Sequence, residues 1–346
     1  MRPALKPGLA TVWRNRDTVQ IGIDPRRAIA LTGMRGAAGL LRLLDGSRDR
    51  HQVLAAAGDL GMDAGTADRV LTLLAAAGAL DDFPAGGHGT LPTGTRARLA
   101  PELATTSLAH RDADGGARTL ARRQAARVRV HGASRASLWI AGLLSAAGVG
   151  LVLSTGPAVP PPGPAGSRGT RPANPGQGPV AGDDANDHVL LWSPAPTPAK
   201  DTRRHPDLVV LADTHRRELP AALVRRAVPH LAASASEAIG VVGPLVLPGR
   251  SACLRCLDLA RTERDPAWPL ILAQLASQAA AEPLACDTVL ATMVAAQATA
   301  QALAFLDQGA GAAAAVTNGT LELVLPGWQW RRRTWHPHPQ CNCRRD

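Results

Sequence analysis

VRVHGASRASLWIAGLLSAAGVGLVLS, residues 128–154, is the stretch that decides the fold. Val128 and Val130 alternate with arginines, which predicts a strand. The spacing then predicts a helix over 137–147 and a second strand over 150–153. A strand, a glycine turn, a helix and a strand open a doubly wound α/β domain, so we expect an α/β fold. Apolar runs of strand length continue the pattern at 188–192, 207–212, 239–247 and 319–325.

The first 83 residues predict a different, smaller α+β domain. Two short strand-like runs, 9–13 and 18–23, flank a turn and predict a hairpin. Three helical patterns follow over 36–44, 47–57 and 63–77, and a short strand at 79–80 closes the unit. A hairpin with three helices is typical of a winged helix. We therefore expect a winged-helix domain over 1–83, a linker with one helix over 84–124, and the α/β domain over 125–346.

Composition limits the function classes. The net charge is 38 − 28 = +10, which permits an acidic partner such as a peptide or polyphosphate. Only 3% of residues are aromatic, with no tyrosine, so a protein that stacks single-stranded bases is disfavoured. The first 25 residues lack the apolar run of a signal peptide, and we expect a cytoplasmic protein. The apolar run 138–153 is shorter than the roughly 18 to 20 residues of a membrane span, so no membrane partner is expected.

The cysteines carry the strongest chemical signal. Cys253 and Cys256 form a C-x-x-C after a predicted strand, and Cys341 and Cys343 form a C-x-C near the other end of the domain. Two such pairs are typical of a four-cysteine zinc site, which has no open position and is therefore structural. The alternatives are a redox C-x-x-C, or a site in which a histidine at 336 or 338 replaces one thiolate.

The turn after the first strand of the α/β domain resembles a phosphate-binding turn with residues missing. Such turns have the pattern G-x-G-x-x-G, whose glycines let backbone N–H groups approach phosphates. Here Gly132 is present, but Ser134 and Ser137 hold the other two glycine positions. Arg135 remains a candidate phosphate ligand. Asp213, at the end of a predicted strand, is a candidate Mg²⁺ ligand or the cap of the next helix. The residues favour a weakened or lost ATP site.

Several of these stretches resemble known families. VRVHGASRASLWIAGLLSAAGVG looks like the opening of the ThiF/MoeB/HesA (ubiquitin-activating-like) family, and residues 240–276 look like its actinobacterial branch tied to thiazole/oxazole-modified peptides (TOMMs). HPHPQCNC at 336–343 looks like that branch's second zinc half-site. The first 83 residues resemble the PqqD-like domain that binds the leader of a precursor peptide, through IGIDPRRAIALTG and LLRLLDG.

The resemblance implies one of two activities. Active members adenylate a C-terminal carboxylate with ATP and Mg²⁺, whereas partner members bind the leader and deliver the precursor to a YcaO-type cyclodehydratase. Besides the altered turn, Ser154 and Thr155 stand where the family has an acidic ribose-binding residue. A Pro/Gly-rich stretch, 156–182, also replaces the segment that carries a catalytic arginine. The sequence therefore favours a non-catalytic leader-binding partner. An active adenylyltransferase and a diverged scaffold or regulator remain alternatives.

We expect the leader to add as a strand to an exposed sheet edge of the first domain. That edge is either the strand containing Val19, Gln20 and Ile21 or the short strand at Leu80. Nearby arginines would suit an acidic leader. DNA binding is disfavoured because the third helix, TADRVLTLLAAAG, is mostly apolar. A homodimer is possible, with the Ala-rich helix 286–308 packing against its copy.

Overall fold

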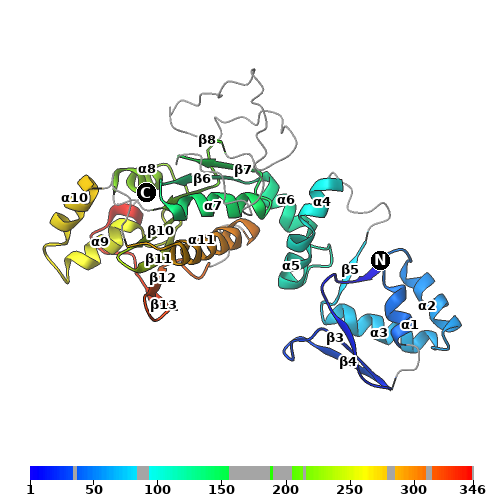
Figure 1. The fold of residues 1–346 in the computed structure, drawn as a ribbon. Coiled ribbons are helices and arrows are strands. Elements are labelled where there is room, and N and C mark those ends of the chain that lie inside the picture. The colour runs from blue at the N-terminus through cyan, green and yellow to red at the C-terminus, as the bar shows by residue number, and fades with distance from the viewer. Residues whose placement is uncertain are drawn as a thin grey trace, which may run out of the picture. The chain divides into compact units, whose positions relative to one another are not determined.

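The computed structural model describes residues 1–33, 37–83, 93–155, 188–189, 205–212, 216–278, 285–308 and 314–344. These form two compact units, Met1–Ala121 and Arg122–Asp346, and each is considered by itself (Figure 1).

The second unit is built on an eight-stranded mixed sheet in the order β13-β12-β11-β10-β9-β6-β7-β8. Its centre is parallel, because β7, β6, β9 and β10 run in the same direction, and the strands outside them are antiparallel. The chain order reverses between β6 and β9. The strands are β6 (Arg127–His131), β7 (Leu151–Ser154), β8 (His188–Val189), β9 (Leu208–Ala212), β10 (His230–Ser236), β11 (Ile239–Val246), β12 (Gly319–Val324) and β13 (Gln329–Thr334).

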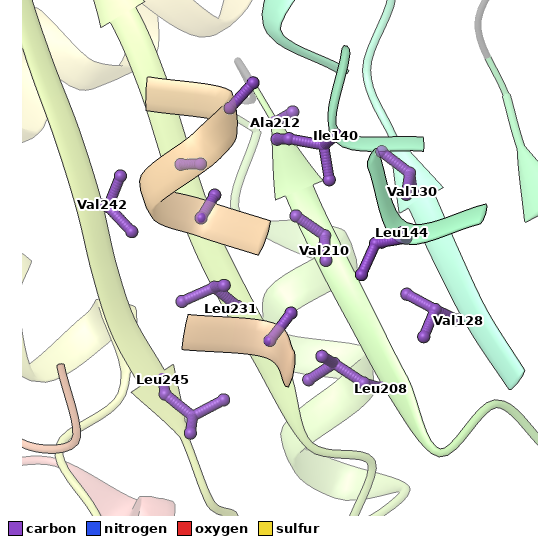
Figure 2. Packing of buried hydrophobic residues seen from close by; sticks show 14 of the residues in the cluster. Val128, Val130, Ile140, Leu144, Leu208, Val210, Ala212, Leu231, Val242 and Leu245 are labelled. Carbon is purple, nitrogen blue, oxygen red and sulfur yellow. The ribbon is translucent and has the colours of Figure 1, made fainter. Parts of the chain in front are cut away.

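Helices cover both faces of this sheet, as the α/β pattern predicts. Alternate residues of β9 divide between two cores. Leu208, Val210 and Ala212 pack with α7 (Arg135–Ala146) and α11 (Thr288–Gln308), as Figure 2 shows. The intervening residues of β9 pack on the other face with α8 (Glu218–Arg225). The apolar run of β9 is continuous because both of its faces are buried.

The Ala-rich helix α11 lies inside the second unit. Eleven of its residues are buried, among them Leu290, Val294 and Phe305. Within the described residues it is the one helix long and apolar enough to cross a membrane, and 56% of its apolar window is buried in the unit. Its composition is that of a core helix. The sheet and α7 cover its buried side, and the packing of this helix against a second copy stays a prediction.

Two strands of the sheet escaped the sequence patterns. β10 has the sequence HLAASAS, whose alanines and serines lack strand propensity. β13, QWRRRT, lies at the edge of the sheet and is mostly exposed, so it needs no apolar alternation. Two further helices, α9 (Leu254–Thr262) and α10 (Trp268–Gln278), follow β11, and a short 3₁₀ turn, Asn342–Arg344, ends the described chain.

The first unit contains a three-stranded antiparallel sheet in the order β2-β3-β4 and a separate pair, β1 and β5. Helices α1 to α3 supply the buried residues that pack against β3 and β4. The elements are β1 (Pro3–Leu5), β2 (Thr11–Asn15), β3 (Thr18–Ile21), β4 (Ile29–Thr32), α1 (Ala37–Leu43), α2 (Arg50–Asp59), α3 (Ala64–Ala76) and β5 (Leu80–Asp82).

The segment expected to be a linker with one helix contains three: α4 (Thr93–Arg98), α5 (Ala100–His110) and α6 (Ala117–Ala125). A buried ion pair ties α5 to the first unit. The Lys6 ammonium lies 3.2 Å from the Asp81 carboxylate and donates to the hydroxyl of Ser107 at 2.7 Å and to the carbonyl of Asp112 at 2.5 Å. The sequence pattern missed this attachment because Lys6 and Ser107 are far apart in the chain.

Candidate metal centre and nucleotide turn

The four predicted cysteines converge in the second unit. Cys253 caps the N-terminus of α9 and Cys256 lies in its first turn, while Cys341 and Cys343 come from the C-terminal tail. Their sulfur atoms all lie within 4.8 Å of one another. Three of the sulfur pairs are 3.5, 3.7 and 3.8 Å apart. Thiolates at about 2.3 Å from a tetrahedral zinc would be about 3.8 Å apart, so the donor set fits a closed four-thiolate metal site.

Disulfide bonds and histidine ligation both fit this arrangement less well than four thiolates do. All four thiols are free, and their sulfur spacing is far above the roughly 2.05 Å of a disulfide bond. Both ring nitrogens of His338 are engaged elsewhere: Nε2 lies 2.8 Å from Glu263, and Nδ1 accepts the backbone N–H of Gln340. His336 is exposed. The alternative in which a histidine replaces a thiolate is therefore disfavoured.

The protonation of the thiols is uneven. A hydrogen bond from Cys253 lowers the pKa of Cys256 to about 4, and a backbone N–H from His338 lowers it further. The same hydrogen bond, with burial, raises the pKa of Cys253. Burial raises the pKa of Cys343 to about 12. The Cys256 thiolate is therefore ready for a cation, whereas Cys253 and Cys343 must lose their protons when a metal binds.

Hydrogen bonds position the C-x-x-C turn. The Ser251 hydroxyl accepts the backbone N–H of Leu247 at 2.7 Å, and the side chain of Asn318 accepts the backbone N–H of Ala252 at 2.7 Å. Trp335, buried beside the cysteines, donates its indole N–H to Thr320 at 2.9 Å. Sequence reasoning missed Asn318, which lies 66 residues from its partner. The position of Trp335, six residues before Cys341, was the one signal in the sequence that could have placed it near the cysteines.

The candidate nucleotide turn lies where the order of parallel strands reverses, between β6 and β9. Ligands of open α/β sheets bind at this point, at the carboxyl ends of the strands. Gly132 follows β6 with φ +139°, and a Cβ added there would lie 2.1 Å from the carbonyl oxygen of Ala212. The close approach of β9 is therefore enough to require this glycine. Asp213, the other candidate at this edge, lies outside the described residues.

Hydroxyl groups already occupy two backbone donors of the turn. The N–H of Ser137 donates to the Ser134 hydroxyl at 3.3 Å, which makes Ser134 the N-cap of α7. The N–H of Gly132 donates to the Thr155 hydroxyl at 3.3 Å. The exposed side chain of Arg135 reaches Thr288 of α11 at 3.5 Å. In a phosphate-binding turn these N–H groups would point at the ligand.

The fold resembles that of E. coli MccB. The crystal structure of MccB with MccA-N7isoASN matches with a TM-score of 0.63 and 13% identity over 100% of both chains. A heterocyclase in complex with substrate and cofactor matches at 0.62 and 14% identity, and the heterocyclase TruD at 0.59 and 17%. Both matches span 99% of this chain, but they span only 39% of the first heterocyclase and 42% of TruD, which are longer proteins. No protein-family model and no curated protein sequence matches the chain. At these identities the likeness shows the fold.

In the first unit, the residues predicted to bind a peptide lie on the central strand. β3 pairs with β2 on one side and with β4 on the other, so its backbone offers no edge at Val19, Gln20 or Ile21. Val19 and Ile21 are buried in the core. The other expected edge, β5, pairs with β1 in the separate two-stranded sheet. The described edges of the three-stranded sheet are β2 and β4.

Proposed function

We propose that this chain is a non-catalytic partner in the modification of a ribosomally made precursor peptide. It binds the leader and presents the precursor to a separate cyclodehydratase of the YcaO type. The observation that carries the proposal is that two backbone N–H groups of the turn are already paired. The hydroxyls of Ser134 and Thr155 accept hydrogen bonds from N–H groups that an ATP phosphate would need. Leader delivery requires neither these donors nor a catalytic arginine.

The structural likenesses support this role. MccB has been crystallised with the peptide MccA, and the two heterocyclase chains are more than twice as long as the part that this chain matches. We infer that the remaining function of such a heterocyclase is supplied here by a second protein. The four cysteines would hold a structural Zn²⁺ that fixes the C-terminal tail. The proposal places the protein in the cytoplasm, where precursor peptides are made.

The second candidate is an active ATP-dependent adenylyltransferase. It is favoured by the full-length likeness to MccB, which has been solved with ATP and with AMPCPP. The occupied turn argues against it. A diverged scaffold or regulator would bind neither ATP nor a peptide.

The leader would bind to the first unit, which we take to be a PqqD-like winged helix. A peptide strand adds where backbone N–H and C=O groups are unpaired. The two free edges differ in how the core face is covered. Trp13 of β2 pairs with Val19, which pairs with Leu31 of β4, so the three side chains share one face. Leu31 is buried, whereas Trp13 is 55% exposed. A peptide strand added at β2 would cover the exposed Trp13. A peptide strand added at β4 would lie beside Leu31, which is already buried.

Proline substitutions can distinguish these edges. Gly22 donates to the carbonyl of Ala10, and Gly33 donates to that of Asp17. Because antiparallel ladders alternate, the N–H of Thr11 on β2 and of Ala30 on β4 then face away from β3. Proline at either position removes an outward donor and keeps the sheet. The two variants are each other's control.

The experiment uses a displayed library of linear peptides selected on the metal-loaded full chain. The proposal predicts enrichment of acidic sequences whose binding is lost in one of the variants Thr11→Pro and Ala30→Pro and kept in the other. No enrichment, or binding that neither variant affects, would contradict a leader site on this sheet. Loss in both variants with unchanged circular dichroism would also contradict a single edge.

A further inference from the structure

The strand β13 gives the eight-stranded sheet a long open edge (Figure 1). It pairs with β12 over six residues in an unbroken register, and no other described strand lies beyond it. At the opposite end of the sheet, the described β8 is only two residues long. β13 contains neither a proline nor a bulge, two features that block the addition of a further strand.

The register of β13 shows which of its backbone groups face outward. Trp335, directly after the strand, donates its N–H to the carbonyl of Asn318. Hydrogen-bonded pairs alternate in an antiparallel ladder, so the odd-numbered residues of β13 also turn their N–H and C=O groups towards β12. The even-numbered residues, Trp330, Arg332 and Thr334, therefore present their backbone groups at the open edge. A strand added here would pair with these three residues.

Three consecutive arginines make this edge basic. The side chains of Arg331, Arg332 and Arg333 are all exposed. Among the described residues, one carboxylate forms an ion pair with this group, since Glu322 lies 4.0 Å from Arg333. The edge therefore keeps a positive excess, which an acidic segment would neutralise.

Charged residues on an edge strand also prevent aggregation, a role for which mobile lysines are typical. The arginines of β13 differ, because contacts hold two of them in place. Arg332 donates to the carbonyl of Ala315 at 2.8 Å, and the guanidinium of Arg333 lies 4.7 Å from the centre of the Trp335 ring. The planar guanidinium matches a carboxylate, and a positioned one loses less entropy on binding. These features favour recognition of carboxylates over simple protection of the edge.

We propose that β13 binds an acidic, extended segment of a partner protein, which adds to the sheet as a further strand. A polypeptide fits because the open edge offers N–H and C=O groups, with which a nucleic acid cannot form a ladder. The proposal rests on the proposed function, in which this partner is the cyclodehydratase. The two heterocyclases are single chains more than twice as long as the part matched here, whereas two separate proteins need a surface that holds them together.

The strand geometry also defines the segment. Arg331 and Arg333 share one face of the sheet, and Trp330 lies on the other, where it packs against the core that contains α11. Acidic residues at every second position would lie opposite the two arginines, and the residues between them would lie beside Trp330. We expect antiparallel addition, which is slightly more stable than parallel addition. The residues between the acids then carry the N–H groups that bond β13.

The probe is a short synthetic peptide in which glutamate alternates with valine and threonine. Its binding to the metal-loaded full chain is measured by fluorescence anisotropy, and the same peptide with lysine for glutamate should not bind. Arg331→Glu should weaken binding of the glutamate peptide about tenfold or more. Arg225→Glu makes the same charge change on α8, which packs against β9, and should bind as the wild type does. Circular dichroism establishes that each variant has kept its fold.

N-methylated peptides test the backbone pairing. Methylation of the residues between the glutamates removes the N–H groups that would bond β13, so it should abolish binding, whereas methylation of the glutamates should be tolerated. Loss of binding with both peptides, or with neither, would overturn strand addition.

Three other results would overturn the proposal. One is a wild type that does not bind the glutamate peptide, and another is binding that Arg331→Glu weakens no more than Arg225→Glu does. The third is binding lost in Thr11→Pro or Ala30→Pro, which would place the peptide on the first unit instead. ATP binding at the nucleotide turn would refute the proposed function and leave the result at β13 unchanged, so the two failures can be distinguished.

Discussion

The hydroxyl of Ser134 accepts the backbone N–H of Ser137 at 3.3 Å, and the hydroxyl of Ser137 donates back to the carbonyl of Ser134 at 2.7 Å. The two residues that stand in glycine positions thus satisfy each other at the start of α7. The N–H of Ser137 is thus already paired within the chain and is not free for a phosphate.

This cap should be measurable locally. Ser134→Ala removes the acceptor, and losing an N-cap costs about 1 kcal/mol. Amide hydrogen exchange in the first turn of α7 should then be about fivefold faster. Ser277→Ala on α10 is the control, since its hydroxyl only bonds the preceding turn of its own exposed helix. Unchanged exchange in Ser134→Ala would show that another group caps α7.

Two glycines near the turn should respond in opposite directions to alanine. Gly132→Ala puts a Cβ against the carbonyl of Ala212 and should destabilise the second unit by about 3 kcal/mol or more. Gly142→Ala, in the middle of α7, meets nothing within 4 Å and should stabilise it by about 0.5–1 kcal/mol. Urea denaturation measures both. A tolerated Gly132→Ala would mean that β9 does not approach the turn so closely.

Metal binding should release protons. The pKa of Cys253 is raised and that of Cys343 is about 12, so both thiols are protonated at neutral pH before a metal displaces their protons. Zinc affinity should therefore fall as the pH is lowered. Zinc titrations in two buffers of different ionisation enthalpy should give at least two protons released per metal at pH 7. Cys343→Ser should release one fewer, and a proton count of zero would contradict the four-thiolate site.

The buried ammonium of Lys6 should be essential to the first unit. Lys6→Met leaves the buried Asp81 carboxylate without its cation and should cost about 3–5 kcal/mol, measured by urea denaturation. The double variant Lys6→Met/Asp81→Leu replaces both charges with apolar groups and should recover most of that loss. If the double variant is no more stable than the single one, hydrogen bonds from Lys6 to the backbone carry the effect instead.

Local patterns predicted much of the fold. The alternation in β6, the helical spacing of α7 and the apolar run of β9 each depend on neighbouring residues, so the α/β class follows from the sequence. The four cysteines were found because metal ligands have characteristic spacings. The third strand of the small sheet, IALT at 29–32, lacks such a pattern. If this strand is not recognised, residues 19–21 are expected to form one half of a hairpin with a free edge. Because the strand is present, they form the central strand of the sheet.

Contacts between distant residues account for the rest. Gly132 and Thr155 are 23 residues apart, and nothing in the sequence says that a hydroxyl from the end of β7 completes the turn. Lys6 and Ser107 are 101 residues apart. The exposure of α10 was equally hidden, because its composition is that of a buried helix and α11, which has a similar composition, is buried.

The most direct test of the central claim is a calorimetric titration of the metal-loaded full chain with Mg-ATP. An active adenylyltransferase of the same fold is the positive control, and AMPCPP repeats the measurement without hydrolysis. Because hydroxyls of the chain occupy the turn, the account predicts no binding at millimolar nucleotide. Saturable binding at micromolar affinity would contradict it, and would make the chain an adenylyltransferase.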